Sequence, residues 1–138
     1  MAGMLYLVPT PIGNLGDISK RARETLESAD FIAAEDTRVT LKLLNHLELK
    51  KPLVSYYEHN KSFKGEKILD RILGGETCAL VSDAGSPAIS DPGEDLVRQC
   101  AAAGIPVCAI PGPCAAITAL SISAQSTGRF CFEGFLST

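Results

Sequence analysis

Short apolar runs alternate along the chain with segments whose apolar residues recur at helical spacing, and this alternation constrains the fold more than any other feature. Strands that alternate with helices over short connections are typical of a parallel sheet with helices on both faces. The apolar runs lie at 5–8, 31–34, 53–56, 77–82 and 106–110, with a sixth candidate at 130–135. The sequence therefore predicts an α/β fold, a three-layer domain with a parallel sheet of about five to six strands.

The 138 residues amount to about one domain, which we expect to span residues 1–138. With 46% hydrophobic and 21% charged residues, the chain is too apolar for a disordered segment. The formal net charge of −3 argues against a stand-alone nucleic-acid-binding module, which usually carries a basic patch. RNA could still be handled by a further domain or by a dimer.

Five cysteines occur, an odd number without a C-x-x-C pair, and most lie within apolar runs. We interpret them as small buried residues of a reducing compartment rather than as a disulfide framework. The chain has no run of about 18 apolar residues and no basic-then-apolar leader. We therefore expect a cytoplasmic protein without a membrane span.

Helix boundaries carry clear signals. Ser19 is a good N-cap for the first helical segment. Asp91 is a cap candidate, Pro92 suits the first helical position, and Glu94 completes the spacing of a capping box. A helix rich in small residues is expected from about Cys114 to Ile122.

Sheets of this kind bind ligands outside the carboxyl ends of their strands, so three loops are the candidate sites. Loop 9–17 has two prolines and two glycines but lacks both the dinucleotide fingerprint and the P-loop pattern. Loop 83–93 is rich in small residues and prolines, which predicts a narrow shelf with exposed backbone groups. Loop 111–116 brings small residues to a helix start. A turn, a helix cap or tight packing would explain each loop equally simply, and we expect no metal site.

Five segments in order resemble the tetrapyrrole methylase superfamily, and most closely its branch that acts on small-subunit ribosomal RNA. Each segment alone would be weak, but their order makes the resemblance specific, and it extends from about residue 5 to about residue 136. The segments are 5–14, 34–38 (Ala-Glu-Asp-Thr-Arg), 58–60 (Glu-His-Asn), 82–93 and 110–113.

The resemblance implies a two-domain methyltransferase that uses S-adenosyl-L-methionine and holds it between its domains. This chain would be the N-terminal domain, and the C-terminal domain would be absent from it. The implied substrate is the 2′-hydroxyl of a cytidine in 16S rRNA or the small ribosomal subunit, and the implied assembly is a homodimer. We expect the chain alone to carry about half of the cofactor site and to be inactive.

By the same resemblance, the cofactor would lie against the three loops. The family commonly has Gly-Asp-Pro where this chain has Gly85-Ser86-Pro87, so that carboxylate cannot be carried over and main-chain contacts must serve instead. Cys114 has no histidine near it in sequence, and we do not expect it to be a nucleophile. The implied cofactor-binding residues are Pro11, Ile12, Asp83, Gly85, Ser86, Pro87, Ala88, Ile89, Cys114, Ala115 and Ala116.

Asp36, Arg38, His59 and Asn60 belong to the rRNA-like segments and follow predicted strands, so we expect them to position the substrate. Arg38 would contact phosphate, and His59 and Asn60 would contact sugar or base. Among these residues His59 has the unperturbed pKa best suited to a general base. The simpler alternatives are an ion pair at a helix start for Asp36 and Arg38 and a surface histidine for His59.

Two rival functions stay open. One is a methyltransferase of the same fold that acts on a tetrapyrrole or another small molecule, against which segments 34–38 and 58–60 argue. The other is a non-catalytic α/β module that binds a nucleotide or a partner.

Overall fold

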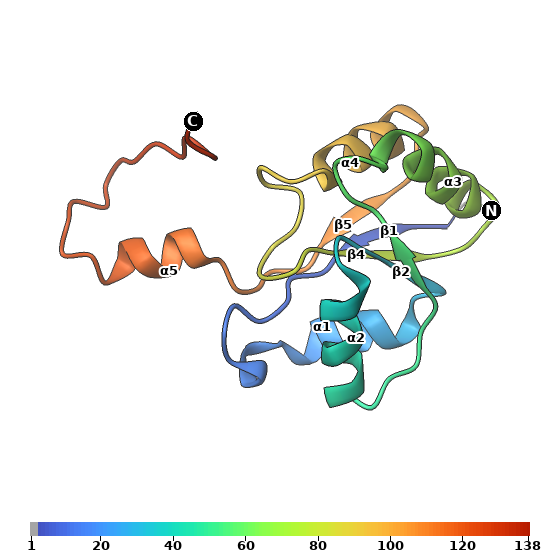
Figure 1. Cartoon of the computed structure of the whole chain (residues 1–138), viewed down its shortest axis with the longest axis horizontal. Coiled ribbons are helices and arrows are strands. Elements are labelled where there is room, and N and C mark those ends of the chain that lie inside the picture. Colours follow the sequence, from blue (N-terminus) through green and yellow to red (C-terminus); the bar gives the residue numbers. More distant parts are fainter. Residues whose placement is uncertain (1–2) are drawn as a thin grey trace.

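The computed structural model describes residues 3–138 and contains a five-stranded sheet in the order β3-β2-β4-β1-β5 (Figure 1). All four strand pairings are parallel. The predicted parallel α/β sheet is therefore confirmed, and each strand falls inside a predicted apolar run. The strands are β1 (Leu5–Leu7), β2 (Phe31–Ala34), β3 (Leu53–Ser55), β4 (Cys78–Val81) and β5 (Val107–Ala109).

The helices form one layer on each side of the sheet, so the predicted three layers are also confirmed. In Figure 1, α3 and α4 lie above the sheet and α1 and α2 lie below it. A short 3-10 helix follows β1, and α5 leads away from β5. The helices are η1 (Leu15–Asp17), α1 (Lys20–Ser28), α2 (Thr37–His46), α3 (Lys61–Leu73), α4 (Gly93–Ala102) and α5 (Ala115–Ser121).

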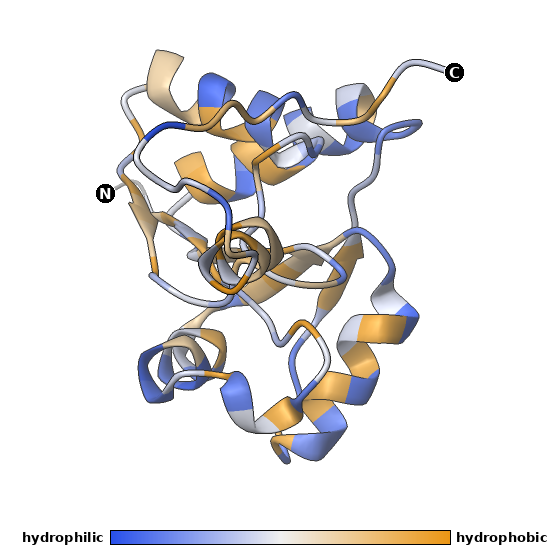
Figure 2. Cartoon of the chain, turned by 90° about the vertical axis from the view of Figure 1, so that its left-hand side faces the viewer, coloured by the Kyte–Doolittle hydropathy of each residue, from blue (hydrophilic) through white to orange (hydrophobic). Residues whose placement is uncertain are grey.

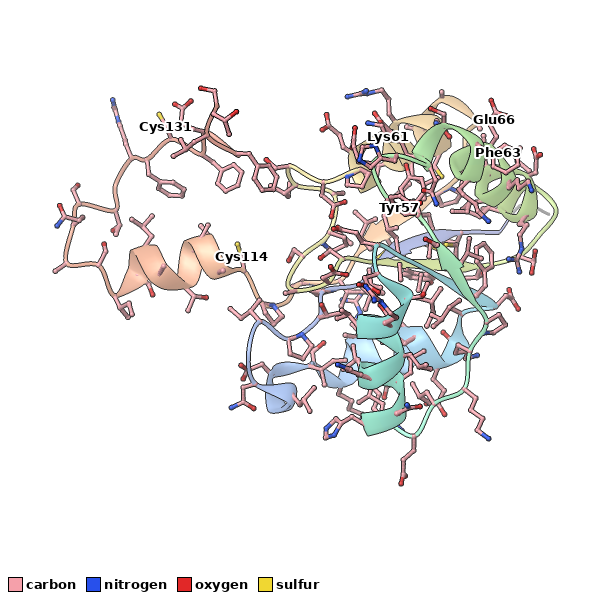
Figure 3. All side chains as sticks on the ribbon, viewed as in Figure 1. Tyr57, Lys61, Phe63, Glu66, Cys114 and Cys131 are labelled. Carbon is pink, nitrogen blue, oxygen red and sulfur yellow. The ribbon has the colours of Figure 1, made fainter. Side chains whose placement is uncertain are left out.

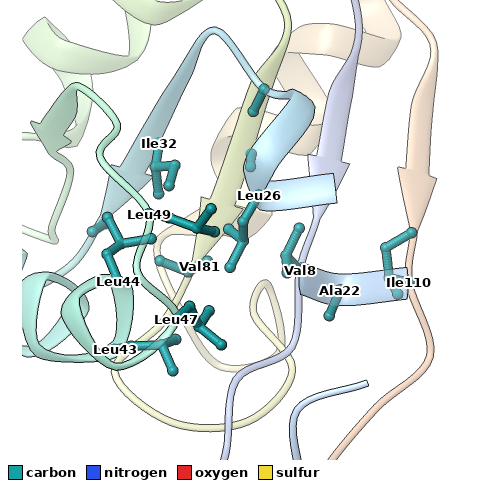
Figure 4. Packing of buried hydrophobic residues seen from close by; sticks show 13 residues of the cluster. Val8, Ala22, Leu26, Ile32, Leu43, Leu44, Leu47, Leu49, Val81 and Ile110 are labelled. Atoms are coloured by element: carbon teal, nitrogen blue, oxygen red, sulfur yellow. The ribbon is translucent and has the colours of Figure 1, made fainter. Parts of the chain in front are cut away.

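Two apolar cores hold the layers together, because neighbouring residues of a strand point to opposite faces of the sheet. Ile32 and Val81 join the core against α1 and α2, which Figure 4 shows with Leu26 and Leu44. Phe31 belongs to the other core, against α3 and α4. β2 and β4 are buried along their whole length, as strands covered on both faces should be. Figure 2 shows the sheet as a hydrophobic middle layer between the helices.

The helix starts follow the predicted caps in part, and α4 begins one residue later than predicted, at Gly93 with Pro92 as its N-cap. The Ser19 hydroxyl accepts a hydrogen bond from the Ala22 N–H at 3.0 Å. Asp91 Oδ1 accepts from the Gly93 N–H at 2.7 Å, at the start of α4. The Glu94 carboxylate turns outward to Arg98 at 2.8 Å, so no reciprocal capping box is seen.

The sixth strand candidate at 130–135 is wrong. This segment forms no strand, and Phe130, Phe132 and Phe135 are exposed. The reason is positional, since α5 carries the chain away from β5 and no strand edge lies beside the segment (Figure 1). An apolar segment forms a strand only where it lies beside an unpaired edge of a sheet.

The cysteine interpretation holds in part. All five cysteines are free, and Cys78 and Cys100 are buried. Burial raises the pKa of the Cys78 thiol to about 12 and that of the Cys100 thiol to about 11. Cys131 is exposed, which the sequence interpretation did not anticipate.

Candidate functional site

The loops after β1, β4 and β5 meet around Gly85. Thr10 and Gly85 exchange backbone hydrogen bonds of 3.1 and 3.0 Å, which join the first two loops. Gly85 has a φ of +79°, and a side chain there would place Cβ 3.3 Å from Ile12 Cγ2 and 3.3 Å from the Pro113 carbonyl oxygen. The Ser86 hydroxyl donates to the same Pro113 carbonyl at 3.2 Å. The three loops thus form one continuous wall at the carboxyl edge of the sheet.

The middle of this wall is a strained and tightly bonded shelf. Ala88 and Ser90 have φ values of 71° and 51°, a left-handed conformation that costs free energy in residues other than glycine. Asp91 Oδ1 holds the turn by accepting from the N–H groups of Ala88 at 3.2 Å and Gly93 at 2.7 Å. Strain of this kind is concentrated at functional sites. The strain therefore marks the shelf as a candidate functional element.

An acidic pocket of about 730 Å³ opens beside the shelf. Six of its lining residues carry carboxylates and only Lys61 carries a positive charge. Its lining residues are Glu35, Glu58, Lys61, Ser82, Asp83, Ala84, Ser86, Ile89, Ser90, Asp91, Pro92, Glu94, Asp95 and Phe135.

The Glu35 carboxyl of this pocket is harder to ionise than an ordinary glutamate. Burial, followed by the nearby charges of Asp83, Asp91 and Asp36, raises the pKa of the Glu35 carboxyl above its usual value. Carboxyls with raised pKa values suit proton transfer and are common at active sites. Sequence reasoning missed Glu35, although its position directly after β2 was a signal.

Lys61 and Tyr56 connect the β3–α3 loop to α4 at the edge of the acidic pocket. Lys61 Nζ bonds both Asp95 and Glu58, which raises the pKa of Lys61 and lowers that of Asp95. Tyr56 is fully buried, and its hydroxyl donates to the Pro92 carbonyl at 2.9 Å. Burial raises the pKa of Tyr56 to about 12, so it stays a hydrogen-bond donor. Figure 3 shows Lys61 at the end of α3 nearest the loops.

A second pocket, the β5-side pocket, has a volume of about 480 Å³ and is mostly apolar. It contains four of the predicted cofactor-binding residues on one continuous stretch, 86–89. Its lining residues are Leu7, Ser86, Pro87, Ala88, Ile89, Glu94, Val97, Ala109, Ile110 and Pro111.

A third pocket, the β1–α2 pocket, has a volume of about 350 Å³ and lies between the β1 loop and α2. It contains the predicted residues Pro11 and Asp83, whereas Ile12 contacts the Gly85 side of the loop. Ser82 and Asp83 line both this pocket and the acidic pocket. Its lining residues are Thr10, Pro11, Gly13, Asn14, Leu15, Val39, Thr40, Lys42, Leu43, Ser82 and Asp83.

The predicted residues on α5 stand apart from these pockets. Cys114 is the N-cap of α5, and Ala115 and Ala116 form its exposed first turn. Figure 3 shows α5 and Cys114 projecting from the rest of the molecule. Their neighbour Pro113 meets the wall by accepting from the Ser86 hydroxyl.

Asp36 and Arg38 make the ion pair that was the simpler alternative. Asp36 caps α2 and accepts from the Arg38 N–H at 2.9 Å, and the Arg38 guanidinium lies 2.9 Å from its other carboxylate oxygen. The hydrogen bond from Arg38 lowers the pKa of Asp36. Neither residue lines the three pockets, yet the Arg38 side chain is 88% exposed and free to meet a second anion.

Asn60 shapes the turn before α3 rather than facing a pocket. Its Oδ1 accepts from the Tyr57 N–H at 2.7 Å, and its Nδ2 donates to the Ser55 carbonyl at 3.1 Å. His59 is exposed and meets the Tyr57 ring edge-on, with centroids 6.4 Å apart. Neither lines the three pockets.

Within residues 3–138, no group of three or more histidine, cysteine, aspartate or glutamate residues is placed to hold a metal ion. No helix of that part of the chain is both long and apolar enough to cross a membrane.

Comparison with known proteins supplies the context for this site. The family model described as Tetrapyrrole (Corrin/Porphyrin) Methylases matches residues 4–132. A protein named ribosomal RNA small subunit methyltransferase I from Synechocystis sp. is 55% identical over 99% of this chain and 49% of its own length. The protein of the same name from Halalkalibacterium halodurans is 58% identical over 97% of this chain and 46% of its own length. The chain thus spans about half the length of these relatives.

Solved structures agree on the fold. Diphthine synthase superposes with a TM-score of 0.74 at 16% identity, covering 94% of this chain and 52% of its own. A uroporphyrin III C-methyltransferase from Thermus thermophilus superposes with a TM-score of 0.68 at 18% identity, covering 91% of this chain and 55% of its own. At such low identity these structures establish the fold alone.

Proposed function

The chain belongs to the tetrapyrrole (corrin/porphyrin) methylase family, and because it does, we propose that it is the N-terminal half of an S-adenosyl-L-methionine-dependent enzyme that methylates small-subunit ribosomal RNA. One observation carries this proposal: 55% identity along 99% of the chain to a protein with that named activity. The specific reaction we propose is methylation of a cytidine 2′-hydroxyl in 16S rRNA. The proposed setting is the cytoplasm, with the small ribosomal subunit as partner.

The residues around Gly85 fit the cofactor. Gly85 lets the three loops pack closely at this edge of the sheet, and the β5-side pocket beside it offers apolar walls for a flat heterocycle. Bound there, S-adenosylmethionine would supply a methyl group on a positively charged sulfur. Backbone groups of residues 85–89 would hold it, with Asp83, Pro11 and Ile12 on one side. Cys114, Ala115 and Ala116 would contact it from the start of α5.

The remaining tasks are to align the hydroxyl and to remove its proton. A ribose hydroxyl is a poor nucleophile, so alignment supplies much of the rate and a general base adds to it. Glu35 is a candidate base because its pKa is raised and it lines the acidic pocket. His59, the base candidate of the sequence analysis, is the second candidate, and Asn60 would act by shaping the loop that carries it.

The proposal includes a C-terminal domain outside this chain and a homodimer. The acidic pocket would repel RNA phosphates, so the strand needs cations from elsewhere. Arg38, beside Asp36, is one exposed cation of this chain that can contact phosphate. A second domain would supply more of them and would cover the open side of the cofactor pocket.

The test uses the full-length protein and small ribosomal subunits from cells that lack it. We expect one 2′-O-methylcytidine per 16S rRNA, detected by mass spectrometry of its nucleosides, and dependent on added S-adenosylmethionine. The 138-residue chain should give none. Methylation of a porphyrinoid but not of the subunits would contradict the proposal and support the small-molecule rival.

A further inference from the structure

We propose that the β1–α2 pocket is a second nucleotide subsite, which takes an amino-bearing base from the RNA strand next to the methylated nucleotide; this rests on the proposed rRNA methylation. The cofactor assignment shares Pro11 and Asp83 with this pocket and uses none of Asn14, Leu15, Val39 or Lys42. The inference follows from its size, its lining and its position beside the acidic pocket.

The pocket suits a single flat base. Its volume of about 350 Å³ lies at the small end of ligand sites, too small for a long cofactor but adequate for one nucleoside. Leu15, from the 3-10 helix after β1, and Val39, from α2, contribute apolar walls from different elements. The apolar side chains of Leu15 and Val39 are 47% and 39% exposed, so a ligand can reach them. Enzymes that bind unstacked bases commonly hold them between apolar side chains.

The polar groups of the pocket favour a base with an exocyclic amino group. Asp83 Oδ1 accepts from the Asp36 N–H at 3.1 Å, whereas Oδ2 has no hydrogen bond within residues 3–138. A carboxylate only accepts, so it pairs with the amino group of cytosine or adenine and repels the carbonyl that uracil presents there. Asn14 uses its Oδ1 to accept from the Gly16 N–H at 2.9 Å, which leaves its amide N–H groups as donors.

The rim adds positive charge beside the acidic pocket, whose only cation among residues 3–138 is Lys61. Lys42 lines the pocket and makes no ion pair within residues 3–138. Arg38 precedes it by one helical turn, so both project from the same side of α2. Asp36 and Asp83 are the acidic neighbours, and Asp36 is already bonded to Arg38. Phosphates that flank the bound base would therefore lie along α2.

The position of the pocket indicates that it would bind the nucleotide adjacent to the methylated one. Ser82 and Asp83 form a wall shared with the acidic pocket, so the two pockets are immediate neighbours. A nucleotide whose sugar enters the acidic pocket would have its chain neighbour at the β1–α2 pocket. The subsite would therefore select RNA sequence without touching the reacting hydroxyl.

The test compares paired variants of the full-length enzyme. Val39→Asp and Lys42→Glu alter the pocket, and Leu41→Asp and Lys50→Glu make the same changes at exposed positions of α2 and the following loop that do not line it. We expect the two pocket variants to raise the KM for small ribosomal subunits about tenfold. kcat, the Kd for S-adenosylmethionine and the Tm should stay at the wild-type values. The two control variants should behave as wild type.

A second readout tests the base. In subunits reconstituted with mutated rRNA, uridine at one flanking position should raise the KM of the wild type several-fold, and Val39→Asp should remove that difference. If the wild type methylates subunits but the pocket variants match their controls, the subsite is wrong and the proposed function stands. If the wild type neither methylates subunits nor binds S-adenosylmethionine, the proposed function fails and takes the subsite with it.

Discussion

The body of the molecule, residues 3–110, and the arm, residues 111–138, both contain apolar runs. These runs are buried in the body and exposed in the arm. In the body, apolar runs are buried on both faces of a sheet, as in β2 and β4. In the arm, Ile122, Phe135 and Leu136 are 83%, 87% and 84% exposed. The arm touches the body near its two ends, where Pro113 accepts from Ser86 and Gly134 lies close to Ser90. An apolar run therefore becomes core only where another element covers it.

Replacing one phenylalanine in each region should give the largest difference in the free energy of unfolding. Phe31→Ala removes a fully buried ring that also supports Arg71, 3.6 Å from its centroid, and should lower the free energy of unfolding by about 3–5 kcal/mol. Phe135→Ala in the same 138-residue chain should change it by no more than about 0.5 kcal/mol. Denaturant titration measures both, and a comparable loss from Phe135→Ala would show that the arm is packed in solution.

Glycine substitutions test the wall at the boundary of the two regions. Gly85→Ala combines a left-handed backbone with contacts of 3.3 Å to Ile12 and Pro113, and should cost about 1–3 kcal/mol. Gly128→Ala is the control in the arm, where nothing lies within 4 Å of an added Cβ. Thermal unfolding of the two variants checks this. Equal Tm values would mean that the three loops do not meet at Gly85.

A smaller effect should follow from the buried hydroxyl that connects β3 to α4. Tyr56→Phe leaves the Pro92 carbonyl without its 2.9 Å partner and should cost about 1 kcal/mol. Tyr57→Phe, on a 40% exposed ring, should cost almost nothing. Denaturant titration of both variants shows whether the loss in the free energy of unfolding comes from the buried hydroxyl or from any tyrosine at this place in the chain. A silent Tyr56→Phe would exclude a stabilising role for this hydrogen bond.

The smallest effect concerns pH. Because the pKa of Glu35 is raised in the folded state, the unfolded chain ionises first as pH rises above the ordinary value of 4.5, and the folded state loses stability. Glu35→Gln should therefore stabilise the chain at about pH 7 and have no such effect below about pH 4. Glu66→Gln, an exposed α3 position seen in Figure 3, is the control. Unfolding at the two pH values measures the difference, and stabilisation of equal size at both would contradict the assigned cause.

The sequence was sufficient for the sheet, the layers and the three candidate loops, because these follow from local periodicity and from helix caps such as Ser19. It placed Asp36 and Arg38 at a strand end and offered their ion pair as the simpler alternative, but it could not choose between that pair and substrate positioning, because the choice depends on side-chain direction. It missed the raised pKa of Glu35, because burial and the charges of Asp83 and Asp91, which are distant in sequence, cause it. The 130–135 error has the same origin, since no local pattern reveals whether a strand edge is available.

Calorimetric titration of S-adenosylmethionine and S-adenosylhomocysteine tests the central claim, that this chain carries one half of a cofactor site built around Gly85. We expect tight binding to the full-length protein, and binding that is lost or much weakened in the 138-residue chain, because half a pocket buries little of a ligand. No binding to either protein would contradict the methyltransferase account and favour a non-catalytic α/β module.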